Sequence, residues 1–435
     1  MIGSGYPWHL SIMENWVPVL FVFAFGACVG SLINVLVYRL PLGLPVVVPS
    51  SRCPACATKL TWRENVPIFG WLLLGGRCRF CKVKISPEYP IVEAIVACLF
   101  AVTYIVCYLP LSLTAGVDLS WLATIQPEWA TNGFVRTWPM FVSLLILFGS
   151  LVAMTLVDFR TFTIPLVLTW VPVGVALVLH PVNGLLAEPG LRQSAGTLGD
   201  WVIATAGPGG WWWVGACVGA VIGIVLSMAL VGFGLIGRSF ADYDEWEREA
   251  LAKHRAEHPD AEQPEEDTPE LWVRYPHARR EMIRELAFLA APVGLAWLAG
   301  TVAVNLGGAT LVPLWLQALT AVGMGYLIGA AVVWGVRIFG SLAFGKEAMG
   351  LGDVHVLAAV GACMGWPDAV MTFFAAVVVG LVSAIAGALR GSASSKMLAF
   401  GPCLAIGALL VFFGKPGLEA AITALIRSPD PINLP

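Results

Sequence analysis

Four cysteines in one polar stretch carry the clearest chemical signal in this sequence. Cys53-Pro-Ala-Cys56 is followed, 21 residues later, by Cys78-Arg-Phe-Cys81. Two such pairs at this separation are typical of a structural Zn²⁺ site with four thiolate ligands, in which tetrahedral closure leaves no position open for catalysis. Two disulfides are the alternative, and they would need an oxidising compartment. The spacing therefore predicts a small domain held together by zinc.

Two aspartates at the ends of apolar runs are the candidates for catalysis. Asp158 closes one run, and Asp353 follows Gly350-Leu-Gly352 at the start of another. Ionisable groups at a membrane boundary are costly, which makes them functional candidates. Two carboxylates that lie close together can share one proton, so that one activates a water molecule while the other polarises a carbonyl group. That is the chemistry of aspartic peptide-bond hydrolysis.

A structural explanation stays open for each aspartate. An aspartate in the first turn of a helix is often only a cap, and the helix dipole favours its anionic form. Asp158 could pair with Arg160. Gly350 and Gly352 allow backbone conformations closed to other residues and let a substrate strand approach closely. Pro165 suits the start of the next helix.

The elements that must position these residues are helices in a lipid bilayer. The chain is 58% hydrophobic and 12% charged, whereas soluble domains carry about 25% charged residues. The mean hydropathy is +0.80. Long apolar runs predict an all-α polytopic membrane protein of about 8 to 10 transmembrane helices, and a β-barrel would show alternating segments instead. The sequence contains these apolar spans: Val17–Val37, Ile91–Pro110, Pro139–Val157, Ile164–Leu179, Trp212–Ile236, Leu286–Leu306, Leu314–Val336, Val354–Trp366, Ala369–Leu389 and Phe400–Phe413. The span Val354–Trp366 is short and could be half of a longer bent element.

Basic residues in the connecting loops predict the orientation of these spans. The segment after the first span carries Arg39, Arg52, Lys59, Arg63, Arg77, Arg79, Lys82 and Lys84. Further basic residues, in every second connection between spans, are Arg160, Arg337, Lys346, Arg390 and Lys396. The positive-inside rule places these loops, the cysteine domain and both aspartates at the cytoplasmic face. We therefore expect the N-terminus outside and, with ten spans, the C-terminus outside too. The first residues carry no basic charge, so no cleaved secretory signal is expected.

One charged segment interrupts the apolar pattern. Residues Asp242 to Glu285 hold 14 of the 28 acidic residues of the chain. The part from Asp244 to His258 is expected to form a charged helix, followed by a flexible acidic loop. A solvated cytoplasmic linker is the simplest interpretation, and a regulatory or docking role, including recruitment of a basic leader, is the alternative.

Several motifs resemble, in order along the chain, those of the type IV prepilin peptidases, a branch of the Gly-x-Gly-Asp membrane aspartic proteases. The segment Lys346-Glu-Ala-Met-Gly-Leu-Gly-Asp353 is similar to the signature of that family. Other stretches agree with it: Gly30–Pro41, Ser51–Cys56, Asn65–Pro67, Gly76–Lys82, Ile85–Glu93 and Phe400–Gly407. The resemblance covers Gly26–Pro181 and Leu314–Phe413.

The resemblance implies an endopeptidase that removes the short basic leader of type IV prepilins or pseudopilins after a glycine. The reaction would take place on the cytoplasmic side of the bacterial inner membrane and would serve a type IV pilus or type II secretion system. Its partners would be those substrates and the lipid bilayer, and no nucleic acid. Many members also methylate the new N-terminal amine with S-adenosylmethionine.

By motif position, the resemblance also assigns residues. Asp158 and Asp353 would be the catalytic pair, and Cys53, Cys56, Cys78 and Cys81 the zinc ligands. The supporting residues would be Gly350, Gly352, Lys346 and Glu347. Gly76 and Arg77 align with a Gly-Lys stretch linked to methylation, and arginine for lysine keeps the charge but changes the hydrogen-bond geometry.

The chain departs from the family pattern in two places. Ile164-Pro165-Leu166 lacks the polar residue that usually follows the proline, and Trp212–Ile236 with Leu286–Leu306 look like an added helical pair that carries the charged insert. Glu93 is expected to be structural and to hydrogen-bond a nearby helix end. A peptidase without methylating activity and a non-catalytic scaffold of a secretion apparatus are the alternative functions.

The sequence predicts six parts along the chain. They are an N-terminal segment with the first transmembrane helix (residues 1–38), a cytoplasmic zinc-binding domain (39–90), the first half of the membrane domain (91–240), the charged cytoplasmic insert (241–285), the second half of the membrane domain with the Gly-x-Gly-Asp motif (286–414) and a C-terminal tail (415–435).

Overall fold

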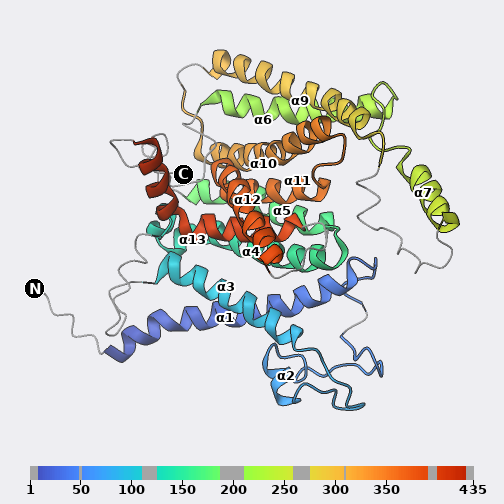
Figure 1. The fold of residues 1–435 in the computed structure, drawn as a ribbon. Coiled ribbons are helices and arrows are strands. Elements are labelled where there is room, and N and C mark those ends of the chain that lie inside the picture. The colour runs from blue at the N-terminus through green and yellow to red at the C-terminus, as the bar shows by residue number, and fades with distance from the viewer. Residues whose placement is uncertain are drawn as a thin grey trace, which may run out of the picture. The chain divides into compact units, whose positions relative to one another are not determined.

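The computed structural model describes residues 8–48, 51–109, 125–186, 210–257, 275–307, 310–389 and 399–427, which form helices joined by loops (Figure 1). Nine of the helices described are long and apolar enough to cross a membrane. No β-strand occurs within these ranges beyond two isolated bridges. The predicted all-α polytopic membrane fold is therefore confirmed. The predicted acidic loop after His258, together with Arg390 and Lys396, lies outside the described residues.

One of the ten predicted apolar spans, Val354–Trp366, was expected to be short, and the structure confirms this. Helix α11 (Leu351–Met364) has 14 residues, which corresponds to a length of about 21 Å against a hydrocarbon core of about 30 Å. Gly365 caps its C-terminal end, and α12 (Trp366–Leu389) begins at the next residue. The expected outward C-terminus depended on ten crossings. The expected side of Asp353 depends only on the helices that precede it, and the described residues before Asp353 contain seven long ones.

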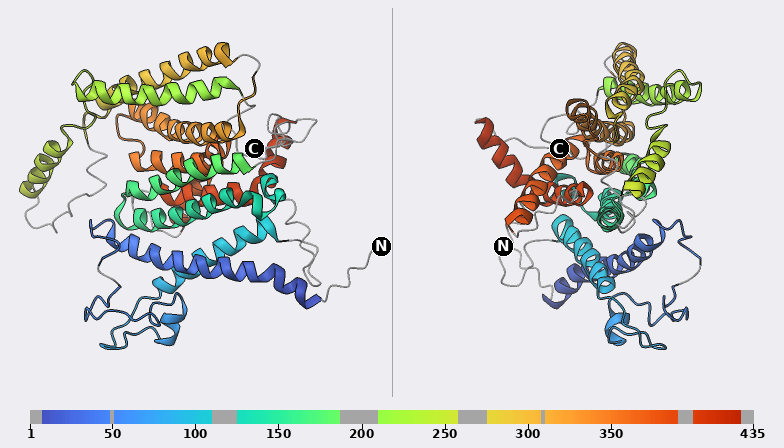
Figure 2. Two further views of the ribbon diagram at one scale, coloured as in Figure 1. Left: turned by 180° about the vertical axis from the view of Figure 1, so that it is seen from behind. Right: turned by 45° about the vertical axis from the view of Figure 1, so that its right-hand side comes forward.

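The helices form two compact units, Met1–Leu179 with Leu409–Leu434 and His180–Ala408, each of which is described by itself. In the first unit, α1 (Trp8–Arg39) lies beside α3 (Glu88–Tyr108), as Figures 1 and 2 show. A Cβ atom on Gly30 would lie 2.6 Å from the Cα atom of Glu93. Glycine is therefore required at this position for the two helices to approach so closely.

Helix α4 (Phe134–Thr161) completes the core of the first unit and follows a short 3₁₀ helix, η3 (Glu128–Asn132). An aromatic cluster joins α4 to α3, with ring centroids of Tyr108 and Phe141 at 5.4 Å. Phe148 of α4 packs edge-on against Phe412 of α13 (Phe400–Ile426), with centroids at 5.3 Å. Helix α5 (Leu166–Leu186) begins directly after Pro165, as predicted.

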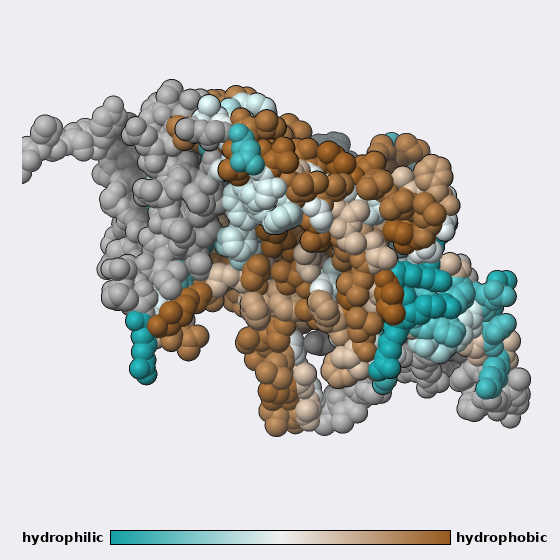
Figure 3. Space-filling model, turned by 90° about the horizontal axis from the view of Figure 1, so that it is seen from above, coloured by the Kyte–Doolittle hydropathy of each residue, from teal (hydrophilic) through white to brown (hydrophobic). Residues whose placement is uncertain are grey.

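In the second unit, α6 (Trp211–Gly232) and α9 (Ala278–Gly307) form a closely packed pair. Three glycines at four-residue spacing, Gly215, Gly219 and Gly223, face α9, and a Cβ atom on Gly219 would lie 2.1 Å from the carbonyl oxygen of Leu295. Small residues at this spacing let helix backbones meet in a membrane. Other side chains of α9 stay exposed, among them Val293 and Trp297, and apolar residues dominate the face seen from above (Figure 3). This distribution suits contact with lipid.

Helix α10 (Leu314–Phe344) is the hub of the second unit and contacts α6, α9, α11 and α12. It was predicted to end at Val336 but continues for two more turns. Helix α9 likewise begins at Ala278, eight residues before the predicted Leu286. Both predictions ended the helices at charged residues, because those charges looked like solvated loop. The structure buries several of them in ion pairs instead.

The insert contains the predicted charged helix as α7 (Tyr243–Glu257). Its base is not a simple solvated linker. The ring of Tyr275 lies 5.6 Å from that of Tyr243 and 5.4 Å from that of Trp246, measured between centroids. These aromatic contacts join the two ends of the insert.

Candidate active site and zinc centre

The four predicted zinc ligands lie together. The Sγ atoms of Cys53, Cys56, Cys78 and Cys81 are all within 4.8 Å of one another. The Sγ atoms of Cys53 and Cys81 are 3.8 Å apart, and a tetrahedron with Zn–S bonds of about 2.3 Å has edges of about 3.8 Å. None of the ten cysteines is disulfide-bonded. The residues therefore fit a four-thiolate Zn²⁺ site, in which the metal would cross-link the two loops.

The two cysteine loops have the same local geometry. The N–H of Cys53 donates to Thr58 O, and the N–H of Cys78 donates to Val83 O. The residue after each second cysteine is left-handed, Ala57 with φ 55° and Lys82 with φ 58°. The two sulfurs of each loop lie within 4.8 Å of each other. The repeated geometry explains how a stretch without regular secondary structure can present four ligands.

The close spacing of the four thiols favours the binding of a cation. Hydrogen bonds from Thr58 lower the pKa of the Cys56 thiol to about 6. At Cys81 a backbone hydrogen bond from Val83 acts in the same direction, but burial and the other three sulfurs outweigh it and raise the pKa to about 11. Four thiolates so close together repel one another, and a bound Zn²⁺ ion would balance their charge.

A buried carboxylate fastens the cysteine domain to the membrane helices. Glu93 of α3 is 8% exposed, and its Oε2 atom accepts a hydrogen bond of 2.6 Å from the N–H of Ile68. Ile68 precedes α2 (Phe69–Leu73) and has φ 63° and ψ −57°. The N–H of Phe69 donates to Pro67 O at 2.6 Å, so Ile68 is the centre of a strained γ-turn. Glu93 thus binds the start of a helix, in the structural role predicted for it.

The pair linked to methylation, Gly76 and Arg77, has a conformational explanation for its glycine. Gly76 has φ +67°, and a Cβ atom there would lie 2.8 Å from the Trp71 ring. The indole N–H of Trp71 donates to Ile85 O, which fixes the ring. Arg77 is exposed. The glycine is therefore needed for the turn, and the role of the pair in methylation stays a prediction.

Asp158 lies in the last turn of α4, in the first unit. Asp158 is 6% exposed, and its carbonyl oxygen accepts a hydrogen bond from the N–H of Phe162. Phe162 ends the helix with φ 53°. Arg160 contacts Glu88 of α3, so the arginine suggested as a partner of Asp158 pairs with another carboxylate.

Asp353 lies in the first turn of α11, in the second unit, and is 9% exposed. The left-handed residue of the turn before it lies outside the Gly-x-Gly pair. Gly350 has φ −70°, and neither Gly350 nor Gly352 is among the described glycines with positive φ. The left-handed glycine is Gly345, which ends α10 with φ +68°. Gly350 and Gly352 therefore do not use the backbone conformations that glycine alone allows.

The segment between Gly345 and Gly350 is held by α10. The N–H of Ala348 donates to the buried hydroxyl of Ser341 at 3.0 Å, and Nη1 of Arg337 donates to Met349 O at 3.2 Å. Glu347, one of the predicted supporting residues, accepts a contact of 2.7 Å from Arg337. Burial raises the pKa of Glu347, and the nearby Arg337 opposes this shift. Lys346 is exposed.

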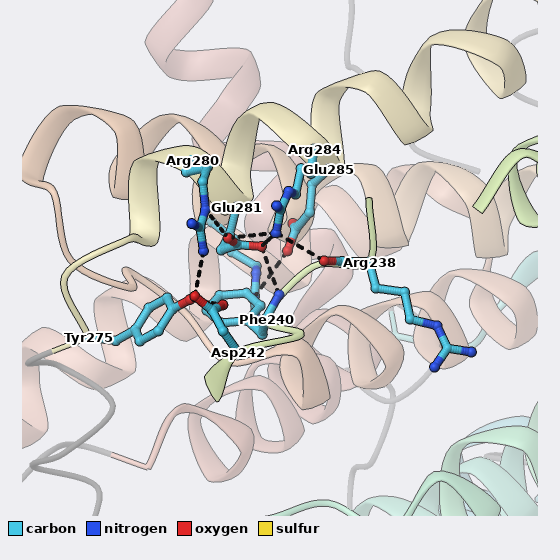
Figure 4. Close-up of polar contacts among 9 residues, drawn as sticks. Arg238, Phe240, Asp242, Tyr275, Arg280, Glu281, Arg284 and Glu285 are labelled. Carbon is cyan, nitrogen blue, oxygen red and sulfur yellow. Dashed lines mark hydrogen bonds and ion pairs between the residues drawn. The ribbon is translucent and has the colours of Figure 1, made fainter. Parts of the chain in front are cut away.

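The base of the insert lies beside this segment in the second unit. Glu281 has no exposed side-chain surface and accepts contacts from Arg280, Arg284 and the N–H of Phe240 (Figure 4). Hydrogen bonds from Tyr275 and Arg280 hold the pKa of Asp242 well below its usual range. Burial raises the pKa of Tyr275 to about 12. Ion pairs and hydrogen bonds thus hold the two ends of the insert together.

The sequence interpretation missed Arg337, Glu285, Glu281 and Ser341. Arg337 was treated as a loop residue, although it lies within α10 and its side chain is only 4% exposed. A charged residue inside an apolar helix was the available signal. One described hollow lies elsewhere, lined by apolar residues of α4 and α5 such as Val142 and Trp170, with a volume of about 660 Å³. It contains no titratable side chain and is not a candidate active site.

Comparison with known proteins defines the class first. Residues 24–107 match the Bacterial Peptidase A24 N-terminal domain, and residues 285–385 match the Type IV leader peptidase family. The first range contains the four cysteines, and the second contains Asp353. Asp158 lies outside both. The second match includes most of α9, so it does not support the prediction that α9 is an addition to the family pattern. A polytopic helical chain with these two matches is a membrane protein of the peptidase class.

Similarity to individual proteins then gives the family. The chain is 49% identical to the prepilin leader peptidase/N-methyltransferase of Myxococcus xanthus over 21% of the chain and 28% of that relative. It is 29% identical to that of Aeromonas hydrophila over 43% of the chain and 63% of the relative, and 31% identical to that of Bacillus subtilis over 48% and 74%. The chain therefore belongs to the prepilin leader peptidase/N-methyltransferase family. It spans less than two thirds of the first relatives named, and no solved structure matches it.

Proposed function

We propose that this protein is a membrane-embedded aspartic endopeptidase that removes the leader of type IV prepilins or pseudopilins after a glycine. The observation that carries the proposal is the place of Asp353. It is a buried carboxylate in the first turn of a helix, within the range that matches the leader peptidase family. If Asp353 only capped the helix, its side chain could stay exposed to solvent, so its burial favours a functional role. The names of the relatives supply the substrate class.

Asp158 is the proposed partner of Asp353. The proposal rests on its burial and on its place at a helix end that the basic loops assign to the same membrane face. The two helix ends differ in their fields. The first turn of α11 favours a negative charge, whereas the last turn of α4 favours a neutral or positive group. We therefore assign Asp353 as the base that activates water and Asp158 as the acid that polarises the scissile carbonyl group.

The zinc domain is proposed to be a cytoplasmic scaffold. A Zn²⁺ ion bound by four thiolates has no open position, so it would supply a structural cross-link and no chemistry. The N-terminus would lie outside the inner membrane, with the zinc domain and both aspartates toward the cytoplasm. A basic leader would approach from that side, with its apolar stem among the spans.

N-methylation of the new N-terminus is proposed as a second activity. The names of the relatives support it. Arg77 is exposed next to the ordered turn at Gly76 and would offer a cation to the carboxylate of S-adenosylmethionine. The side chain of Arg77 is the part of this pair to be tested, since Gly76 is already explained by its conformation.

Product analysis tests both activities at once. Purified protein in lipid would be incubated with a prepilin bearing a basic leader, with and without S-adenosylmethionine, and the products identified by mass spectrometry. We expect one cut after a glycine, and a mass increase of one methyl group only when the methyl donor is present. A cut product without the methyl group would leave a peptidase alone. An uncut prepilin under both conditions would favour a non-catalytic scaffold.

A further inference from the structure

Two successive turns of α10 form a cradle for the segment that leads into Asp353. Arg337, Gly340 and Ser341 lie on one face of the helix, because residues three and four apart are neighbours there. Ser341 accepts the N–H of Ala348, and Arg337 donates to Met349 O. A Cβ atom on Gly340 would lie 2.8 Å from the Cβ atom of Ala348, so glycine leaves the space that Ala348 fills. The backbone that precedes Gly350 is thus held against α10.

Arg337 is the charged centre of this cradle. Its Nη1 atom also contacts Glu347, and its Nη2 atom lies 3.3 Å from the carboxylate of Glu285 on α9. Glu285 accepts a second hydrogen bond, of 2.6 Å, from the indole N–H of Trp334. The guanidinium group lies over the ring of Phe240, 5.4 Å from its centroid. One planar group with fixed donors therefore spans α9, the start of the insert and the segment before Asp353.

Stability alone does not explain this arrangement. A buried ion pair contributes little compared with apolar residues of the same size, because the charges must be desolvated. The fork of an arginine does offer direction, since it can bind two carboxylates and a carbonyl oxygen at set angles. The carbonyl that it binds belongs to Met349, one residue before the N-cap of α11. Any shift there would be passed directly to Asp353 in the first turn.

We propose that Arg337 is a positioning residue for leader cleavage, which sets the start of α11 and hence the place of the Asp353 carboxylate. The inference rests on the proposed peptidase function and adds to it a residue outside the Gly-x-Gly-Asp segment. Arg337 acts through the backbone of Met349 and through Glu347. It does not itself contact the reacting groups.

Arg337→Lys is the main test, because lysine keeps the positive charge but loses the planar fork. A misplacement of about 1 Å can cost about 100-fold in rate. We therefore expect kcat for leader cleavage to fall by about 10- to 100-fold while KM for the prepilin changes by less than about threefold. Arg284→Gln is the matched control. It removes an arginine that contacts Glu281 at the insert base, and we expect wild-type kcat.

Hydrogen exchange supplies a measurement that does not depend on activity. The N–H of Ala348 is protected by Ser341 only while the segment lies in the cradle. We expect the peptide that covers residues 346–351 to exchange at least about 10-fold faster in Arg337→Lys than in Arg284→Gln. Zinc content and gel filtration would establish that each variant is folded. If Arg337→Lys does not fold, a triple change of Arg337, Glu285 and Glu347 to Gln leaves no buried charge unpaired and takes its place.

The outcomes separate the two proposals. A loss of kcat with a constant KM and faster exchange of the segment supports the positioning role. Wild-type kcat in Arg337→Lys, or a loss of kcat without faster exchange, overturns the role while leaving the peptidase proposal intact. Failure of the wild-type protein and of Arg284→Gln to cleave prepilin contradicts the proposed function, and the positioning role falls with it.

Discussion

The bond between Glu93 and Ile68 should decide how firmly the zinc domain is attached to the membrane helices. Glu93→Ala removes a charge-assisted hydrogen bond of 2.6 Å from a residue that is 8% exposed. Such bonds contribute about 1.5–3 kcal/mol. The bond also holds Ile68 in a γ-turn with positive φ, a conformation that costs about 1–3 kcal/mol when nothing supports it. Without Glu93 the strained turn should relax.

The expected magnitude follows from that energy. A loss of about 1.5–3 kcal/mol multiplies the population of the open state about 10- to 150-fold, since 1.36 kcal/mol corresponds to a factor of ten. Amides of α2 such as Gly70 and Leu72, which bond to Val66 and Ile68, should exchange faster by that factor. The assay is hydrogen exchange of the peptide covering residues 65–76 in the zinc-loaded protein. Zinc content should stay at the wild-type value, because no ligand is changed.

Two further variants make this prediction specific. Glu88→Gln removes another acidic residue of α3, whose pairing with Arg160 is exposed and should contribute at most about 1 kcal/mol. Its effect on α2 should be small. Ile68→Gly relieves the strained turn, so combining it with Glu93→Ala should restore part of the protection. Exchange of α2 that is unchanged in Glu93→Ala, or equally fast in Glu88→Gln, would refute the reasoning.

Three other predictions concern the zinc domain and helix packing. A strong chelator should remove one zinc ion per chain and open residues 51–86 to proteolysis, because metal binding supplies the folding free energy of such sites; protection that persists after complete removal of zinc would contradict this. Lys82→Gly should raise the chelator concentration needed for half-removal of zinc. Lys82 has φ 58°, and this conformation costs about 1–2 kcal/mol for a residue with a side chain. A lower chelator concentration would show that the lysine side chain matters more than its backbone. Gly219→Leu should lower the thermal transition temperature of the protein in detergent, because the new Cβ atom would meet Leu295 O at 2.1 Å. Gly232→Leu should not lower it, because the space around Gly232 is open. Equal transition temperatures in the two variants would show that the close packing of α6 on α9 is not required.

The parts of the fold that could be predicted are those with strong local patterns. Apolar runs predicted ten spans, nine of which are long helices in the described residues, and the paired cysteine motifs predicted four ligands that the structure does bring together. The charged helix of the insert was expected within one residue of its observed bounds. These features depend on neighbouring residues and on period, which a sequence displays directly.

The parts that could not be predicted depend on contacts between distant residues. Glu281 and Arg337 look like loop charges until their distant partners are known, which are the N–H of Phe240 for Glu281 and the carboxylate of Glu285 for Arg337. The helix ends were misplaced for that reason. The left-handed glycine before Asp353 is Gly345 and not Gly350, which the sequence did not indicate, because a motif shows which residues are present but not how the preceding helix ends.

The central claim is that Asp158 and Asp353 act together on a peptide bond, and their replacement by asparagine tests it most directly. Asparagine keeps the shape of the side chain and removes the acid. Asp368→Asn is the matched control, because Asp368 is also a buried acidic residue in the first turn of a helix, α12. All three variants would be purified, checked for zinc content and exchange, and assayed for removal of the leader from a prepilin. The account predicts that Asp158→Asn and Asp353→Asn remain folded and lose cleavage by at least about 1,000-fold, as expected when a group needed in the transition state is removed, while Asp368→Asn cleaves normally. Retained cleavage in either of the first two variants would contradict it.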